Sequence, residues 1–590
     1  MPDNANELME KLTALCKRRG FIFPSSEIYG GIGGFWDYGP LGVELKRNIK
    51  DAWWNDVVRR RDDMVGLDCS IIMNPKVWEA SGHIGGFSDP MMTCKSCKKL
   101  FRADHLYMVP WVKAEAIQQL SPEYAEADQE LEERLLQIQQ GNMSDMERGK
   151  ARTEAQRLAR YRKDVAVYRL VPFWKFVVAS TEQEALQSAQ LSNKEAKAFH
   201  GDAKQLPPKL IGEYMASEVE MRVPVCCPNC GEADSLTPPR QFNLMFKSHA
   251  GAMEDSASVV YLRPETAQGI FCNYKNVLDT QRIKVPFGIA QVGKSFRNEI
   301  NPRNFTFRSR EFEQMEIEFF CRPSEADTWY EYWRNERYQW YIRHGLRSSR
   351  LRLRDHQKDE LAHYARACAD VEYEFPFGIS ELEGIANRTD YDLTQHQKFS
   401  GKDLTYFDDE AWEADKDKFN PDKFGGDVKA AKEAADAAKK GLPYRFIPYV
   451  IEPSGGCDRA ALAFLCEAYC EDEAPDENGK MQTRVVMKLH PRLAPIKAAV
   501  FPLVKKEGMP EIATKIYKEL QNSGITAFYD EKGAVGRRYR RQDEAGTPFC
   551  ITVDGQTLQD STVTIRDRDS LVQERIGVSQ VLDYVRQRVV

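Results

Sequence analysis

Arginine, carboxylate and aromatic residues gather in one short stretch near the middle of the chain. The stretch runs from Arg297-Asn298-Glu299 through a polar turn to Arg308-Ser309-Arg310-Glu311-Phe312 and Glu316. A guanidinium can neutralise a phosphate, an aromatic ring can stack on a nucleotide base, and carboxylates can hold Mg²⁺ or an amine. Two antiparallel strands joined at the turn would bring four of these side chains to one sheet surface: Arg297, Glu299, Phe312 and Glu316. A hairpin that carries only surface ion pairs is the simpler alternative.

A glycine turn before an apolar helix supplies another arginine. Gly455-Gly456-Cys457-Asp458-Arg459 precedes AALAFLCEAYC, which is apolar enough to form a buried helix. An arginine at the start of such a helix could face the outer phosphates of a nucleotide. Because glycine turns before helices are common, this segment gains weight only beside the block at 297–316.

A phosphate-loop pattern lies close by, since residues 288–295, GIAQVGKS, satisfy G-x-x-x-x-G-K-[ST]. A true phosphate loop needs a helix that begins at its lysine, because the helix N-terminus and backbone N–H groups hold the phosphates. Here Pro302 and alternating aromatic residues follow Lys294, which favours a strand and a turn. The sequence therefore predicts that Lys294 is not a phosphate-loop lysine.

Four cysteines form two C-x-x-C pairs with the spacing of metal knuckles. They are Cys94 with Cys97 and Cys227 with Cys230. Two such pairs make a closed tetrahedral thiolate site, which is typical of structural Zn²⁺. The pairs lie about 130 residues apart, a separation that an inserted helical region between them would explain. Cys226 is an alternative ligand, although the C-P-N-C-G turn favours Cys227, and four thiols that never meet remain the alternative without metal.

The whole chain is long and apolar enough to position these segments. It has 590 residues, a length that predicts three to five domains. Hydrophobic residues make up 42% of the chain and the net charge is only −6, which excludes a chain that is disordered throughout. The sequence contains no run of about 18 apolar residues, so no membrane-spanning helix is expected. The N-terminal segment does not have the pattern of a secretory signal. Fourteen cysteines without an export signal predict a reducing, cytoplasmic location.

Composition divides the chain into four expected parts. These are 1–91, with helices at 8–19 and 41–57; 92–240, with the cysteine pairs and a charged helical arm at 112–200; 241–490, with a surface excursion at 400–440; and 491–590. The arm is expected to be a solvated insertion, and contact of its basic stretch (148–163) with tRNA is the alternative. The last part alternates strand-like and helix-like segments, which predicts an α/β domain.

The paired segments resemble two motifs of the class II aminoacyl-tRNA synthetases: 297–316 resembles motif 2 and 455–459 resembles motif 3. More particular segments resemble the glycyl-tRNA synthetase family of homodimeric type, over nearly the whole chain apart from the arm and the excursion. These segments are WDYGPLGVELKRNIKDAWW, RPETAQGIF, RNEINPRNF, SREFEQMEIEFF, ELEGIANRTDYDL and EPSGG. Cys457 departs modestly from the family pattern, which often has another small residue there.

The resemblance implies an α+β fold in which a class II catalytic domain, an antiparallel sheet flanked by helices, carries the inserted zinc-knuckle and helical region. The helix at 41–57 would belong to motif 1, the dimer interface. The last 100 residues would be an α/β anticodon-binding domain. They hold 16 basic and 13 acidic residues, and RRYRR (537–541) is expected to contact tRNA phosphates, with a plain solvated face as the alternative.

The resemblance also implies the site residues. ATP would be bound by Arg297, Asn298, Glu299, Phe307, Arg308, Ser309, Arg310, Glu311, Phe312, Glu381, Leu382, Gly456, Cys457, Asp458 and Arg459. Glycine would be bound by Arg102, Glu265, Phe312, Glu313, Gln314, Met315, Glu316, Glu452, Pro453, Ser454, Gly455 and Gly456. Arg297, Glu299 and Arg459 would act in catalysis, several carboxylates suit a substrate ammonium group, and bulk around the α-carbon would exclude larger amino acids.

The implied activity is that of a glycine–tRNA ligase (EC 6.1.1.14), with ATP, glycine and tRNA-Gly as substrates, Mg²⁺ as cofactor, structural Zn²⁺, and a homodimeric state. A non-catalytic nucleic-acid-binding relative, such as a polymerase accessory subunit, is the alternative from another class. It has no physical need for two phosphate-facing arginines and a set of carboxylates. A synthetase for serine or proline is the other alternative, and glycine-dependent ATP–pyrophosphate exchange separates the three.

Overall fold

A computed structural model describes residues 2–113, 122–139, 143–164, 173–178, 185–187, 189–190, 203–205, 208–210, 227–232, 235–255, 257–358, 360–362, 365–475, 480–506 and 508–589. The chain forms two compact units, one from residues 1–87 with 244–590 and the other from 88–243. Within the described residues, no helix combines the length and the apolar composition that a membrane span requires.

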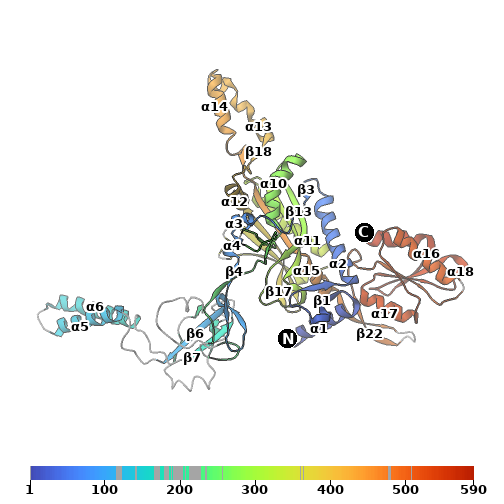
Figure 1. The fold of residues 1–590 in the computed structure, drawn as a ribbon, viewed down its shortest axis with the longest axis horizontal. Helices are drawn as coiled ribbons and strands as arrows, with labels where there is room; N and C mark the ends of the chain where they lie inside the picture. Colours follow the sequence, from blue (N-terminus) through green and yellow to red (C-terminus); the bar gives the residue numbers. More distant parts are fainter. Residues whose placement is uncertain are drawn as a thin grey trace. The chain divides into compact units, whose positions relative to one another are not determined.

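A seven-stranded sheet forms the centre of the larger unit (Figure 1). All neighbouring strands in it are antiparallel except one parallel pair at the edge. Its strand order is β15 (Leu351–Asp355), β16 (Ala367–Phe375), β17 (Gly378–Thr389), β20 (Tyr449–Gly456), β14 (Glu311–Cys321), β13 (Phe287–Phe296) and β3 (Met64–Gly66). The predicted antiparallel sheet flanked by helices is confirmed.

Helices cover both faces of this sheet. Successive side chains of a strand point to opposite faces, and each face has apolar side chains that pack against helices. On one face, Met315, Ile317 and Phe319 of β14 are fully buried against helices. These helices are α2 (Pro40–Trp54), α11 (Ala326–Arg343) and α15 (Cys457–Ala468). On the other face, Phe320 packs with α10 (Ala267–Gln281) and α12 (Tyr391–Ser400). The helices predicted near 41–57 and after the glycine turn are confirmed, as is the helix predicted at 8–19, which is α1 (Pro2–Arg19).

The phosphate-loop pattern lies inside a strand, as expected. Residues 288–295 belong to β13, which pairs with β14 over its whole length from Phe287↔Phe320 to Phe296↔Glu311. No helix begins at Lys294, and its ammonium group pairs with the carboxylate of Glu311. A strand offers no ring of free N–H groups to a phosphate, so this stretch has no phosphate-loop geometry.

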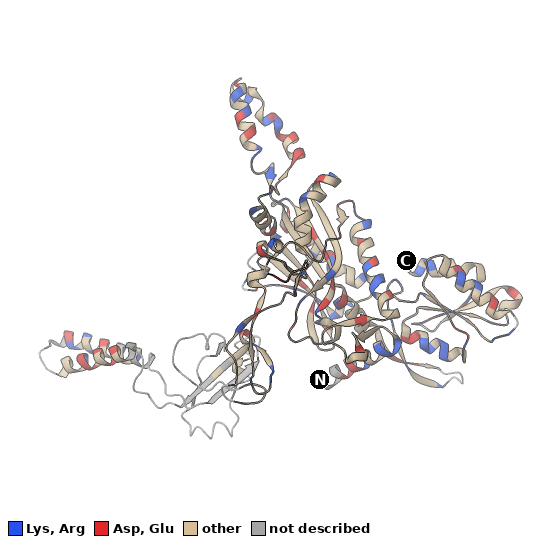
Figure 2. Ribbon diagram, in the orientation of Figure 1, with Lys and Arg blue, Asp and Glu red and all other residues tan. Residues whose placement is uncertain are grey.

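The smaller unit contains two sheets and a helical hairpin. One sheet has the order β10 (Arg240–Asn243), β4 (Ser88–Thr93), β5 (Leu100–Arg102), and the other joins β6 (Leu106–Lys113) to β7 (Phe173–Val178), β8 (Ala203–Gln205) and β9 (Lys209–Leu210). The hairpin consists of α5 (Pro122–Gln139) and α6 (Asp145–Asp164). The charged residues of α5 are mainly acidic and those of α6 mainly basic (Figure 2). The expectation of charged, solvated helices is thus confirmed for the part of the arm that the structure describes.

The surface excursion and the C-terminal part belong to the larger unit. The excursion contains α13 (Asp409–Asp415) and α14 (Val428–Ala438), the short Ala/Lys helix expected there. The C-terminal sheet has the order β24 (Ala527–Tyr529), β23 (Ala498–Pro502), β25 (Phe549–Val553), β26 (Thr562–Asp567), β27 (Gln573–Gly577). Helices α16 (Met509–Asn522) and α19 (Val581–Val589) pack on it, which gives the predicted α/β domain.

The basic run of the C-terminal domain is only partly a surface feature. It lies on α17 (Val535–Ala545), as predicted, but Arg538 is 2% exposed and donates to the backbone carbonyls of Pro502, Leu503 and Asp530. Arg537 is exposed and Arg540 pairs with Asp543. The expectation that the whole run faces solvent or tRNA is therefore wrong for Arg538, which joins the helix to the end of β23.

Candidate active site

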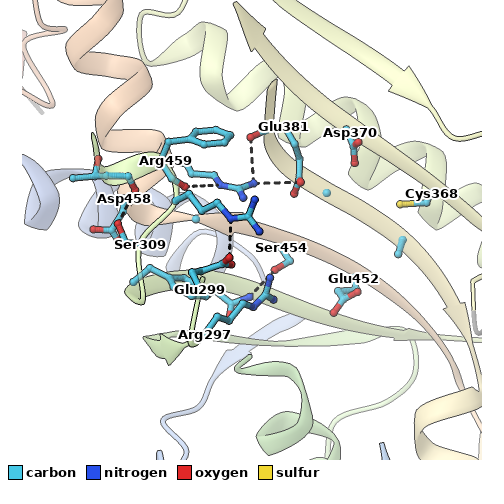
Figure 3. Close-up of a pocket in the computed structure, with 18 of the residues that line it drawn as sticks. Arg297, Glu299, Ser309, Cys368, Asp370, Glu381, Glu452, Ser454, Asp458 and Arg459 are labelled. Carbon is cyan, nitrogen blue, oxygen red and sulfur yellow. Dashed lines mark hydrogen bonds and ion pairs between the residues drawn. The ribbon is translucent and has the colours of Figure 1, made fainter. Parts of the chain in front are cut away.

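A cavity of about 340 Å³ opens on the central sheet, where β14, β17 and β20 lie side by side (Figure 3). The residues that line it come from segments up to 162 positions apart in the chain, from Arg297 to Arg459. They are Arg297, Glu299, Thr306, Phe307, Arg308, Ser309, Phe312, Gln314, His356, Cys368, Asp370, Glu381, Gly384, Ala386, Glu452, Ser454, Gly456, Asp458 and Arg459. The structure thus brings together most of the side chains predicted to bind ATP.

Arg297 follows directly after β13, and its guanidinium group is held by a backbone carbonyl and two aromatic rings. Its Nε donates to the carbonyl of Pro264 at 3.1 Å, and its guanidinium carbon lies 5.5 Å from the ring centre of Phe312 and 5.6 Å from that of Phe87. The aromatic contacts keep the charged group extended over the sheet. Arg297 therefore presents a positive charge to the cavity beside an aromatic ring.

Glu299 organises the loop between β13 and β14. Its carboxylate accepts from Arg308 Nε at 2.7 Å, and its backbone carbonyl accepts from Arg310 Nε at 2.8 Å. Arg310 also donates to the carbonyl of Gly33 at 2.7 Å, which ties the glycine-rich N-terminal segment to the loop. Glu299 is 9% exposed. Its buried carboxylate therefore holds the Arg308 side chain beside the cavity through a charge-assisted hydrogen bond.

Arg459 enters the cavity from the first turn of α15. Its guanidinium carbon lies 4.5 Å from the ring centre of Phe307, and its Nη1 lies 3.3 Å from Glu381 Oε2 of β17 (Figure 3). Arg459 and Arg297 are thus two guanidinium groups that face one cavity, with the carboxylates of Glu299 and Glu381 next to them. Such an arrangement suits a polyphosphate and a divalent cation.

A group of buried carboxylates lies on the same sheet face. Glu316 of β14 is 1% exposed, and its cross-strand partner on β20 is Ser454. Glu316 accepts from the hydroxyl of Thr266, and Gln314 donates to the Ser454 hydroxyl at 3.2 Å. Glu265 accepts from Gln268 at 3.0 Å and lies 3.4 Å from His83. Four of the residues predicted to bind glycine, Glu265, Glu316, Glu452 and Ser454, thus fall on β14, on β20 and just before α10.

Arg388 is a residue of this group that the sequence analysis did not single out. Its Nη1 donates to both carboxylate oxygens of Glu452 at 2.9 Å, and its Nε and Nη2 donate to Asp392 at 2.7 and 2.9 Å. All three residues are at most 9% exposed. The one signal for Arg388 is its place within the quoted segment ELEGIANRTDYDL, because its partner Glu452 lies 64 positions away.

Burial and charge act in opposite directions on these carboxyls. Burial raises the pKa of Glu452 to about 8, with Glu316 and Glu265 acting in the same direction against the attraction of Arg388. Burial and the neighbouring charge of Glu265 likewise raise the pKa of Glu316. For Glu265, burial is outweighed by His83 and Arg388, which hold the pKa of that carboxyl well below its usual range. Burial thus opposes the charged forms of Glu316 and Glu452, whereas the neighbours of Glu265 favour its charged form.

Some predicted site residues do not point into the cavity. Glu313 and Met315 lie on the opposite face of β14, where Met315 is in the core and Glu313 pairs with Lys46 and Lys50 at 2.8 and 2.9 Å. Leu382 and Cys457 are also fully buried in the core. Arg102 belongs to the other compact unit, where it lies 2.7 Å from Asp104 and 3.2 Å from Asp89.

The four predicted zinc ligands converge in the smaller unit. The sulfurs of Cys94 and Cys230 are 3.7 Å apart, as are those of Cys97 and Cys227. A tetrahedron with Zn–S bonds of about 2.3 Å separates its sulfurs by about 3.8 Å, so the four thiols fit a zinc ion. The backbone N–H groups of Cys97 and Asn229 donate to Cys94 and Cys227 sulfurs at 3.4 Å, which favours thiolates. Cys226, the alternative ligand, lies outside the described residues.

Comparisons with known proteins agree with this geometry. A family model described as "Anticodon binding domain" matches residues 497–588. Glycine–tRNA ligases are similar over nearly the full length: that of Rhodopirellula baltica is 48% identical and covers 98% of this chain and 99% of its own. Those of Thermobifida fusca (43%; 99% and 98%) and Geobacillus thermodenitrificans (44%; 100% and 99%) are also similar.

A solved prolyl-tRNA synthetase from Cryptosporidium parvum shares the fold at 10% identity, with a TM-score of 0.50 over 98% of this chain and 76% of that one. The predicted class II catalytic fold and the C-terminal anticodon-binding domain are therefore confirmed. Given its similarity to these ligases over almost its whole length, the chain belongs to the glycine–tRNA ligase family.

Proposed function

We propose that this protein activates glycine with ATP and transfers it to the 3′-terminal adenosine of tRNA-Gly. The observation that carries the proposal is the pair of buried carboxyls of Glu316 and Glu452, which lie within 4.8 Å of one another. Glu452 lines the cavity that two arginines face, and Glu265 is a partly buried carboxylate of the same group. A pocket with this charge attracts a small ammonium group, and its buried walls leave little room for a side chain. The cavity next to it has the size and charge for a folded ATP.

In the first step, a carboxylate oxygen of glycine attacks the α-phosphorus of ATP. The new P–O bond forms as the bond to the β-phosphate oxygen breaks, and pyrophosphate leaves with the electron pair. Arg297 would neutralise charge at the α-phosphate and Arg459 at the outer phosphates, while Phe312 offers its ring to adenine. Neither step needs a side-chain nucleophile, so positioning and charge neutralisation would supply most of the acceleration.

In the second step, a ribose hydroxyl of the terminal adenosine attacks the carbonyl carbon of glycyl-adenylate. The ester bond forms, the bond to the phosphate oxygen breaks, AMP leaves, and the hydroxyl proton passes to solvent or to the leaving phosphate. Glu265, Glu316 and Ser454 would hold the glycine ammonium group through both steps. Holding the same group throughout prevents release of the reactive adenylate.

Two metals are part of the proposal. Mg²⁺, when bound with ATP, would supply positive charge between the phosphates, and Glu381 and Glu299 are the carboxylates placed to hold it. Zn²⁺ would be bound by Cys94, Cys97, Cys227 and Cys230 in a closed set of four ligands, and its role would be structural.

We further propose that residues 491–590 bind the anticodon region of the tRNA and that the catalytic part extends over 1–91 and 241–490, with 92–240 as an insertion. Helix α2 would belong to a homodimer interface. The cytoplasmic location predicted from the sequence stays a prediction. These assignments follow the family to which the chain belongs.

Charging of tRNA tests the whole proposal. We expect the purified protein to attach radiolabelled glycine to a tRNA-Gly transcript in the presence of ATP and Mg²⁺. A tRNA-Pro transcript and radiolabelled proline serve as the matched control reactions. Charging with proline, or no charging with any amino acid while the protein is folded, would contradict the proposal.

A further inference from the structure

Glu318 is a fully buried carboxyl that the proposed reaction does not use. It lies on β14 two residues after Glu316, and its side chain is 0% exposed. Neither of its oxygens has a hydrogen-bond partner in the part of the chain that the structure describes. A buried polar group without a partner is costly and is rare in folded proteins, so its presence calls for an explanation.

The strand register places Glu318 inside the carboxylate group. Because successive side chains of a strand alternate between faces, Glu318 lies on the same sheet face as Glu316. The pairs Glu316↔Ser454 and Phe319↔Ile451 on either side of it put Glu318 opposite Glu452 of β20. One carboxylate oxygen from each of Glu316, Glu318 and Glu452 lies within 4.8 Å of the other two.

Arg388 is the cation near Glu318, and it attracts this carboxyl without a hydrogen bond to it in the part of the chain that the structure describes. From β17, Arg388 faces the cluster, but its donors go to Glu452 of β20 and to Asp392 of α12. From β14, Glu316 is a further carboxylate, and it already accepts from the Thr266 hydroxyl. Of the three clustered glutamates, Glu316 and Glu452 therefore each have a donor, and Glu318 has none.

The remaining polar groups near the cluster do not supply a charge to Glu318 either. On the α10 side, Glu265 accepts from Gln268 and lies beside His83, and the amide oxygen of Gln268 is bonded to His396 of α12 at 2.9 Å. An ionised Glu318 would thus be a buried anion among other anions. Such a group takes up a proton instead, because an isolated buried carboxylate is far more expensive than a buried carboxylic acid.

We propose that Glu318 carries a proton in the working enzyme and acts as a positioning residue of the glycine site, where its single O–H group donates to one of the two neighbouring carboxylates, Glu316 or Glu452. Burial, Glu452 and Glu316 all raise the pKa of Glu318 well above its ordinary value, in agreement with the geometry. The positioning role rests on the proposed glycine-binding role of the cluster. The protonation state does not rest on it, and the two parts are tested separately.

The physical consequence is a cluster with a defined charge. With Glu318 neutral, the positive charge of Arg388 offsets the negative charge of one of its two carboxylate partners, Glu452 and Asp392. The negative charge that remains in the cluster is available to the ammonium group of the substrate. A neutral Glu318 also restricts the rotation of the neighbouring carboxylate that accepts its hydrogen bond, because this bond fixes the position of the accepting oxygen. Glu318 would thus aim the ammonium-binding oxygens without touching glycine.

The protonation state is tested by thermal unfolding of Glu318→Gln between pH 4.5 and pH 8, without any substrate. The unfolded chain releases this proton above about pH 4.5 and the native protein keeps it, so the wild-type protein loses stability from Glu318 as the pH rises. Glutamine has no proton to keep. We expect Glu318→Gln to have nearly the wild-type Tm at pH 4.5 and a Tm that is higher by about 2 °C or more at pH 8.

Glu313→Gln is the matched control on the same strand and the opposite face. Burial acts on Glu313 too, but Lys46 and Lys50 outweigh it and lower its pKa, so Glu313 stabilises the native protein above about pH 4.5 and this stability is lost as the pH falls. Glu313→Gln should therefore have a lower Tm than wild type at pH 8, with a difference that shrinks toward pH 4.5. A lower Tm of Glu318→Gln at pH 8 would overturn the proposal, since it would mean that Glu318 is ionised and bound to a cation.

The positioning role is tested by the glycine KM in ATP–pyrophosphate exchange. Glu318→Leu removes the donor and should raise the glycine KM about tenfold or more with little change in the ATP KM, whereas Glu318→Gln keeps a donor of the same shape and should restore most of the loss. Equal KM values for the leucine and glutamine variants would overturn the positioning role. Absence of glycine-dependent exchange in the wild-type protein would instead contradict the proposed function, and the Tm result would stand.

Discussion

Arg459 Nη1 lies 3.3 Å from Glu381 Oε2, which joins the first turn of α15 to β17 across the mouth of the cavity. The two residues are 78 positions apart, and each was expected at the ATP site from a separate segment. An arginine that already has a carboxylate partner is held in place before a polyphosphate arrives. ATP with Mg²⁺ would exchange this contact for two others, phosphate with Arg459 and metal with Glu381, so little charge is left unpaired in either state.

Arg297 and Lys294 differ in what they face, although they are three residues apart. Arg297 lines the cavity, whereas Lys294 is on the outer side of β13 and pairs with Glu311. We expect Arg297→Ala to lower kcat/KM for ATP in the exchange reaction about 100- to 1,000-fold, since it removes a preorganised charge at the reacting phosphate. Lys294→Met should change kcat/KM less than about threefold. Equal and near-complete loss in both variants would revive the phosphate-loop hypothesis.

The cysteine cluster predicts one zinc ion per chain. Elemental analysis of protein purified without added metal should find it, and Cys97→Ser should lose the metal together with thermal stability, since three thiolates bind Zn²⁺ far less tightly than four. Cys272→Ser is the control, because Cys272 is an exposed thiol on α10, outside the cluster. A metal-free protein that is folded and as stable as the metal-bound one would contradict the assignment.

Arg388 is expected to be the most sensitive charged residue of the sheet. Arg388→Met leaves the buried carboxylates of Glu452 and Asp392 without their cation, which should lower the free energy of unfolding by about 3–5 kcal/mol. Arg366→Met breaks a surface pair with Asp327 and should cost less than about 1 kcal/mol. Denaturant titration of both variants measures the difference, and similar values would mean that Arg388 does not hold the cluster.

The sequence predicted the elements that carry chemistry better than the contacts between them. The hairpin at 297–316, the arginine of the glycine turn and the two cysteine pairs could each be identified because their signal is local. The alternation of a strand also predicts that Glu313 and Met315 leave the site face on which Glu316 lies. The resemblance implied the continuous range 312–316 for glycine binding, and this range does not take the alternation into account.

Other features depend on long-range pairing, which no local pattern contains. Arg388 meets Glu452 only because β17 and β20 are neighbours in the sheet. Arg538 belongs to a run of five residues of which four are arginines, yet the helix turns it toward the end of β23 and buries it. Glu318 looks like one more strand carboxylate until the register places it opposite Glu452.

Glu316 and Ser454 face each other across β14 and β20 and should affect glycine binding to different degrees. Glu316→Gln removes charge without changing shape, so it should lower kcat/KM for glycine strongly, by about 100-fold or more, while the fold stays intact. Ser454→Ala removes one hydroxyl and should be milder, with slightly better use of alanine. Glu316→Gln that behaves like wild type would mean that this carboxylate does not hold the ammonium group.

Amino-acid-dependent ATP–pyrophosphate exchange by the wild-type protein tests the central claim most directly. The methyl group of L-alanine must clash with the buried walls of the glycine pocket, and it must displace the ammonium group from its carboxylates. The free-energy cost of the lost contacts adds to the cost of the clash. We expect exchange with glycine and a kcat/KM for L-alanine at least about a thousandfold lower, near 4 kcal/mol in transition-state terms. Exchange that depends on alanine, serine or proline as well as on glycine, or that no amino acid stimulates, would contradict the account.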